Sequence, residues 1–82
     1  MPARRPVPPP DEASLREAAL AHLARYAATE ARLGQVLTRR LERWARQEAG
    51  QETPEAIAAR LAALRPAIAR IVAALARAGA VD

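Results

Sequence analysis

Side chains suited to acid–base or nucleophilic chemistry are few in this sequence of 82 residues. Asp11, Ser14 and His22 are the residue types of a hydrolytic triad, but a triad needs a nucleophile, a base and an orienting acid in a defined geometry. Nothing in their spacing indicates such a geometry, and Ser14 with Glu17 fits the capping pattern of a helix start. The sequence therefore predicts a protein that is not an enzyme and has no catalytic residues.

The same residues give little basis for a metal or cofactor site. A metal site needs several converging ligands, and the chain has one histidine and no cysteine. His22 falls on the expected apolar face of a helix, so we interpret it as a residue at the edge of the core. Gly34, Gly50 and Gly79 are too far apart to form a phosphate-binding loop. We expect no metal, no cofactor and no small-molecule substrate.

The most distinctive polar feature is a row of arginines in the middle of the chain. Four of them are spaced seven, four and three residues apart, and at about 100° per residue they fall on one side of a helix. A fifth flanks this row toward the apolar side. The five candidate partner-binding residues are Arg32, Arg39, Arg40, Arg43 and Arg46. Two interpretations stay open: a solvated helix face, or a docking surface for an acidic protein or a nucleic-acid backbone.

Apolar periodicity predicts three helices that position these side chains, over residues 11–28, 29–49 and 54–78. Thr29 and Thr53 are the expected N-caps of the second and third helices, and Gly50 and Gly79 the expected C-terminal stops. The predicted packing residues are Leu23, Tyr26, Leu37, Leu41, Trp44, Leu61, Leu64, Ile68 and Ile71. No stretch has the alternation of a strand.

Proline content sets the boundaries of this helical unit. Residues 1–10 include five prolines together with Arg4 and Arg5, and we expect them to form a disordered tail ahead of an all-α three-helix unit over residues 11–82. Pro66 lies inside the third helix. Apolar residues keep the same helical spacing before and after Pro66. We therefore expect a kink at Pro66 rather than a break.

Composition gives only general bounds on location and partners. The formal net charge of +4 permits an anionic partner without requiring one. No apolar run approaches the roughly 20 residues of a membrane span, and we expect a cytoplasmic protein with no membrane partner. An aromatic content of 2% argues against single-strand binding by base stacking.

Three phrases in the chain, ALAHLARYAAT over residues 19–29, RLGQVLTRR over residues 32–40 and ALARAGAVD over residues 74–82, resemble the RecX family of bacterial recombination regulators. Members of that family carry a similar ALxxLxRYAAS, a RLxxVLxRR and a closing Leu-x-x-x-Gly followed by two hydrophobic residues and Asp. The resemblance extends from Leu15 to Asp82. The chain departs from the family pattern at His22, where an aromatic residue is expected, and at Gly34, which weakens a helix.

This resemblance implies a function. The RecX family is built from tandem three-helix units that bind the RecA recombinase filament and modulate it, usually by inhibition, without enzymatic activity. The chain would correspond to the first such unit, with Asp82 at the entry to the next, and one unit is expected to bind more weakly than several. The alternative is a small basic helical module that binds DNA. In that case the third helix should read the DNA, yet Arg60, Arg65, Arg70 and Arg77 are expected to scatter around its axis.

Overall fold

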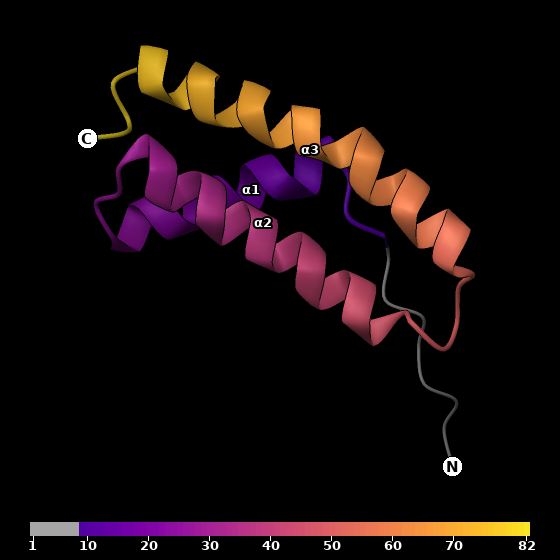
Figure 1. Cartoon of the computed structure of the whole chain (residues 1–82). Helices are drawn as coiled ribbons and strands as arrows, with labels where there is room; N and C mark the ends of the chain where they lie inside the picture. The colour runs from indigo at the N-terminus through magenta and orange to yellow at the C-terminus, as the bar shows by residue number, and fades with distance from the viewer. Residues whose placement is uncertain (1–8) are drawn as a thin grey trace.

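The computed structural model describes residues 9–82, which form three α-helices and no strand. These are α1 (Glu12–Arg25), α2 (Glu30–Gln47) and α3 (Pro54–Arg77). The three helices run up, down and up, so that α1 and α3 are parallel and α2 is antiparallel to both (Figure 1). This confirms the predicted all-α three-helix unit. Most of the predicted tail over residues 1–10 lies outside the described residues, but Pro10, which was assigned to it, is buried.

The start of α1 differs in detail from the predicted capping pattern. Asp11, not Ser14, is the N-cap. The Ser14 backbone N–H donates to Asp11 Oδ1 at 2.7 Å, and the Asp11 backbone N–H donates to Ser14 Oγ at 3.0 Å. The helix therefore begins one turn earlier than a cap at Ser14 requires, and Ser14 replaces Glu17 as the second member of the capping box.

The end of α1 corrects a second expectation. The helix stops at Arg25, and Tyr26 adopts an extended conformation with φ −136° and ψ 133°. The connection over residues 26–29 lets the chain reverse direction before Thr29 caps α2 by accepting from the Arg32 backbone N–H at 3.1 Å. Because Tyr26 lies beyond the last turn of α1, it is 59% exposed and is not the core residue that the sequence predicted.

The ends of α2 and α3 use different chemistry. Gly50 was the expected stop of α2, but α2 ends earlier, at Gln47. Its C-cap is Glu48, whose carbonyl accepts from the Gln51 and Glu52 backbone N–H groups. Gly79 ends α3 as expected, with φ +79°. Ala80 N–H donates to the Leu75 carbonyl and Gly79 N–H to the Ala76 carbonyl. This is the Schellman pattern, in which a glycine adopts the left-handed conformation just past the helix.

α3 continues through Pro66 as one helix, as its uninterrupted apolar phase predicted. Pro66 is exposed, so the backbone carbonyl that loses its hydrogen bond faces the solvent side of the helix. Figure 1 shows that the helix axis changes direction near its middle. The expected kink is therefore compatible with a single long helix that reaches both α1 and α2.

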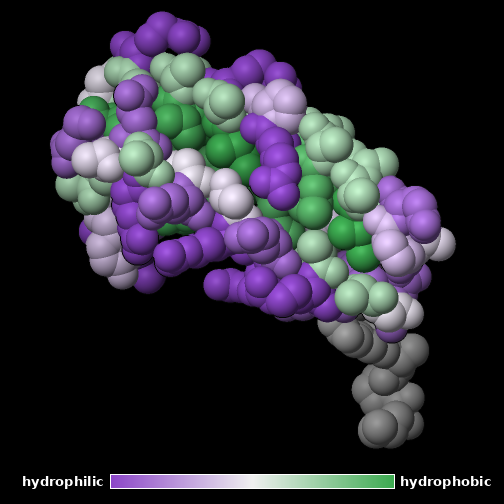
Figure 2. Space-filling model, viewed as in Figure 1, coloured by the Kyte–Doolittle hydropathy of each residue, from purple (hydrophilic) through white to green (hydrophobic). Residues whose placement is uncertain are grey.

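One leucine-rich core joins the three helices. Leu15, Leu33, Leu37 and Leu41 are its largest fully buried side chains. α3 contributes Leu64, Ala67, Ile68, Ile71 and Leu75. Of the predicted packing residues, Leu37, Leu41, Trp44, Leu64, Ile68 and Ile71 are buried, whereas Leu23 and Leu61 are half-buried at the edge of the core. On the face shown in Figure 2, hydrophobic residues follow α3 while α2 presents hydrophilic side chains.

The C-terminal segment closes one end of this core. The Asp82 backbone N–H donates to the Ala28 carbonyl at 3.0 Å, and Val81 packs against the core. Ala28 itself is 5% exposed. The last residues of the chain therefore tie the end of α3 to the connection between α1 and α2 (Figure 1).

Truncation of the buried apolar side chains of α3 should remove most of the free energy of unfolding of this small unit. We expect Leu64→Ala or Ile68→Ala to lower the free energy of unfolding by about 2–4 kcal/mol, because each change removes buried apolar surface and leaves a cavity. Thermal unfolding followed by circular dichroism measures this loss, with Arg65→Ala as an exposed control on the same helix. An unchanged melting temperature for both core variants would show that α3 does not carry the core.

The glycines of α2 and of the α3 end should respond to alanine in opposite directions. A Cβ added at Gly34 meets no atom within 4 Å, so Gly34→Ala should raise the free energy of unfolding by about 0.5–1 kcal/mol through helix propensity. Gly79→Ala should lower it by about 1 kcal/mol, because its positive φ is unfavourable for an L-residue. Urea unfolding of both variants tests the pair, and stabilisation by both would contradict the helix end described above.

The N-cap of α1 should make part of the free energy of unfolding depend on pH in the acid range. The Ser14 backbone N–H, followed by the Ser14 hydroxyl, lowers the pKa of the Asp11 carboxyl below its usual range. A lowered pKa means that the stabilisation is complete above the unfolded-state pKa and is lost as pH falls through the folded-state pKa. The melting temperature of the wild type should decrease as the pH falls from 6 into the acid range. Asp11→Asn should make this decrease smaller, while its amide still caps the helix. Identical pH profiles would contradict this role.

Candidate partner-binding surface

The arginines predicted as a partner-binding row lie on the side of α2 that faces away from the core. Because Leu33, Leu37 and Leu41 point inward, residues two positions further along the helix point to solvent. All five candidates, Arg32, Arg39, Arg40, Arg43 and Arg46, are exposed. The structure does not give all five the same surroundings.

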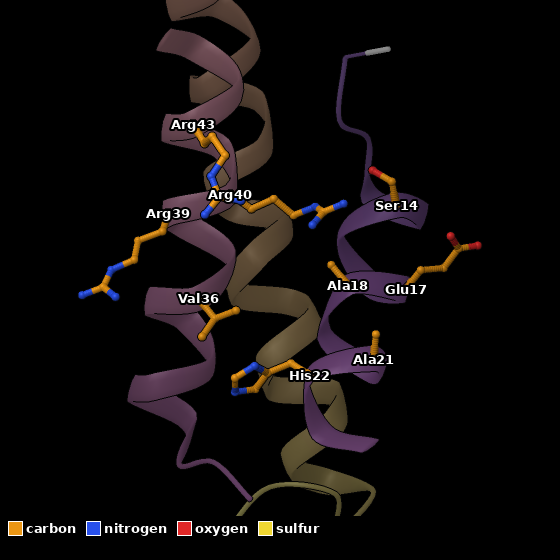
Figure 3. Close-up of a pocket in the computed structure, with 9 residues that line it drawn as sticks. All are labelled: Ser14, Glu17, Ala18, Ala21, His22, Val36, Arg39, Arg40 and Arg43. Carbon is orange, nitrogen blue, oxygen red and sulfur yellow. The ribbon is translucent and has the colours of Figure 1, made fainter. Parts of the chain in front are cut away.

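Three of the five arginines line a groove of about 500 Å³ between α1 and α2, and we call this the α1–α2 groove. They are Arg39, Arg40 and Arg43. Figure 3 shows that the Arg40 side chain extends toward α1, whereas Arg39 points away from α1. The lining also includes small apolar side chains from both helices: Ala18, Ala21 and Val36. The groove therefore combines a basic edge with an apolar floor.

Arg32 and Arg46 do not line this groove. Arg32 follows the N-cap of α2 by three residues. Arg46 lies in the last turn of the same helix, where the helix dipole stabilises a positive charge. The sequence pattern correctly placed all five on one helix surface. It did not reveal that only the central three line a groove beside a second helix.

No carboxylate neutralises the arginines of α2 in the part of the chain that the structure describes. Among residues 9–82 the ion pair is Arg70 with Glu12, at 2.7 Å. Glu42 is close to this row in sequence but lies outside the α1–α2 groove. The guanidinium groups of the groove are thus available to an external acidic group, which Arg can bind through two parallel hydrogen bonds.

α1 supplies the other side of the groove through residues that the sequence did not assign to a site. Ser14, Glu17 and His22 line it. His22 is half-buried, as expected for the edge of the core, and its ring centroid lies 5.2 Å from that of Tyr26. In Figure 3 the imidazole points toward Val36 on α2, whereas Glu17 points away. The sequence showed that α1 has a polar face. It did not show which residues of that face lie beside α2, because this depends on how the two helices pack.

A second hollow of about 480 Å³ continues the groove toward the start of the described chain. It shares Ser14, Arg40 and Arg43 with the α1–α2 groove and adds Trp44 and Pro10. Trp44 is 8% exposed, in agreement with its interpretation as a core residue. Its buried indole Nε1 has no hydrogen-bond partner among residues 9–82. The extended groove therefore includes a largely buried tryptophan in its lining.

The arginines of α3 lie on different sides of the helix, as expected, but two of the four share a side: Arg60 lines a separate hollow and Arg65 lines neither groove. Arg70 and Arg77 line one groove of about 520 Å³ together with Arg16 of α1, and we call this the α1–α3 groove. Arg70 and Arg77 are seven residues apart, which is close to two helical turns. The Arg70–Glu12 pair spans this groove with side chains 64% and 54% exposed. Such an exposed pair contributes at most about 1 kcal/mol.

Two further properties bear on what these surfaces bind. Within residues 9–82, no group of three or more His, Cys, Asp or Glu side chains converges as a metal site would require. None of the three described helices is both long enough and apolar enough to cross a membrane. Comparison with known proteins found no matching family model, no matching curated protein and no matching solved structure.

Proposed function

We propose that this chain is a non-catalytic binding module that docks onto a RecA-type recombinase filament and modulates it, as its resemblance to RecX implies. The observation that carries the proposal is the set of three exposed arginines in the α1–α2 groove, none of which pairs with a carboxylate among residues 9–82. An acidic surface of the filament protein would supply the carboxylates. The module would act by occupying that surface and would carry out no chemical step.

The apolar floor of the groove favours a protein partner over a nucleic-acid backbone. Phosphates are recognised by charge and hydrogen bonding, and contact with Ala18, Ala21 and Val36 would add nothing to that recognition. A protein segment can place apolar side chains on this floor while its carboxylates meet Arg40 and Arg43. Tyr26 is the one aromatic side chain with large exposure among residues 9–82, so base stacking has little support here.

Charge reversal at the groove tests the proposal. Arg39→Glu with Arg43→Glu should weaken binding to recombinase filaments assembled on single-stranded DNA by about tenfold or more, because attraction becomes repulsion at the rim. Wild-type binding should also weaken as salt rises. Fluorescence anisotropy of the labelled chain measures both effects.

The matched control is Arg25→Glu with Arg65→Glu, which changes the net charge equally at exposed positions outside both grooves. This control should keep most of the affinity. Equal losses from the two double variants would show that only net charge matters. Binding to bare single-stranded DNA that is as tight as binding to the filament would favour the DNA-binding alternative.

A further inference from the structure

We propose that the α1–α3 groove is a second docking surface, and that its occupant is an acidic amphipathic helix of a protein partner. This inference does not depend on the recombinase assignment. It depends on how α1 and α3 bring together alanines and arginines that are far apart in the sequence.

The floor of the α1–α3 groove is made of small side chains. Ala13 from α1 and Ala73 and Ala74 from α3 line it, with Ile71 at its base. Small side chains let helix axes approach to about 8 Å, the lower end of the usual packing range. Because α1 and α3 are parallel neighbours (Figure 1), a helix laid between them would bury its own apolar stripe on this floor. The groove has a volume of about 520 Å³.

The rim of the groove carries an excess of positive charge. Arg16, Arg70 and Arg77 face one acid, Glu12. Glu12 pairs with Arg70, so Arg16 and Arg77 have no carboxylate partner among residues 9–82. A helical partner with glutamates or aspartates on both borders of its apolar stripe would complement these two arginines. Its apolar side chains would also meet Leu20, which is 46% exposed one turn beyond Arg16.

A second copy of this chain does not fit the groove equally well. The chain has a formal net charge of +4, and none of its helices has more acidic than basic residues. α2 and α3 in particular carry an excess of arginine. Self-docking would bring like charges together at the rim, which opposes association. The complementary partner is therefore an acidic helix from another protein.

The probe for this proposal is a synthetic helical peptide of about five turns, with alanine and leucine on one face and glutamates seven residues apart along each border. It should bind the full chain with a salt-dependent affinity. The same peptide with glutamine in place of glutamate should bind at least about tenfold more weakly. A peptide of the same composition, but scrambled so that it has no apolar face, should also bind weakly.

Two pairs of variants locate the binding. Arg16→Glu with Arg77→Glu should reduce peptide affinity by about tenfold, whereas Arg39→Glu with Arg43→Glu should change it by less than about threefold. Glu12→Gln should raise the affinity several-fold, because it releases Arg70 and removes the one acid of the groove. Its matched control, Glu17→Gln on the opposite side of α1, should leave the affinity unchanged. Circular dichroism confirms that each variant is folded.

The proposal is overturned if Glu12→Gln and Glu17→Gln behave alike, or if the glutamate and glutamine peptides bind equally. It is also overturned if peptide-induced amide shifts in an NMR titration fall on Val36 and Arg40 rather than on Ala13, Ala73 and Arg77. Because the two grooves are tested by different arginine pairs, failure at the α1–α3 groove leaves the proposal for the α1–α2 groove unaffected.

Discussion

Both grooves of this protein depend on the contact of one long helix with two shorter ones. α3 places its apolar residues against Leu15 of α1 and against Leu33, Leu37 and Leu41 of α2. In a unit of this size, few large side chains are available to offset the entropy of ordering the chain. α3 must therefore keep its apolar phase through Pro66, and it does so by placing the proline on the exposed side. The hydrogen bond from Asp82 to Ala28 then closes the end of the bundle.

This packing determines which arginines can act together. A helix with arginines on several sides has no defined binding face until its neighbours cover part of it. Burial of the leucines of α2 leaves Arg39, Arg40 and Arg43 lining the groove beside α1, with Arg40 extending toward α1 (Figure 3). In the same way, the parallel arrangement of α1 and α3 brings Arg16 to the groove that Arg70 and Arg77 share. Arginine was present throughout the sequence, but the helix packing creates two grooves with apolar floors, one on each side of α1.

The sequence was sufficient for the parts of the fold that depend on local physics. Apolar periodicity identified the three helices, and threonine followed by an acid or by proline identified the starts of α2 and α3. It also placed Trp44 and Ile68 in the core. The errors came from competition between local signals. Asp11 and Ser14 can both cap a helix, and the chain uses Asp11 because the helix begins one turn earlier. Tyr26 matched the apolar phase of α1, but the helix ended at Arg25 to allow the chain to reverse.

The candidate surfaces were less predictable because they join residues across helices. The arginine row of α2 was visible as a spacing pattern, yet its pairing with Ser14 and His22 depends on the register between α1 and α2. The α1–α3 groove was missed for a similar reason. On a helical wheel Arg70 and Arg77 share a side, but only the position of α1 adds Arg16 and an alanine floor. A single sequence gives the phase of each helix without giving its rotation against the others.

The most direct test of this account is site-specific photo-crosslinking to recombinase filaments. A photoreactive residue at position 39 lies at the rim of the α1–α2 groove, and one at the exposed Ala69 lies on α3 away from both grooves. We expect position 39 to crosslink to the recombinase protein and position 69 not to do so. Crosslinks from position 69 alone, or crosslinks from position 39 only to DNA, would contradict it.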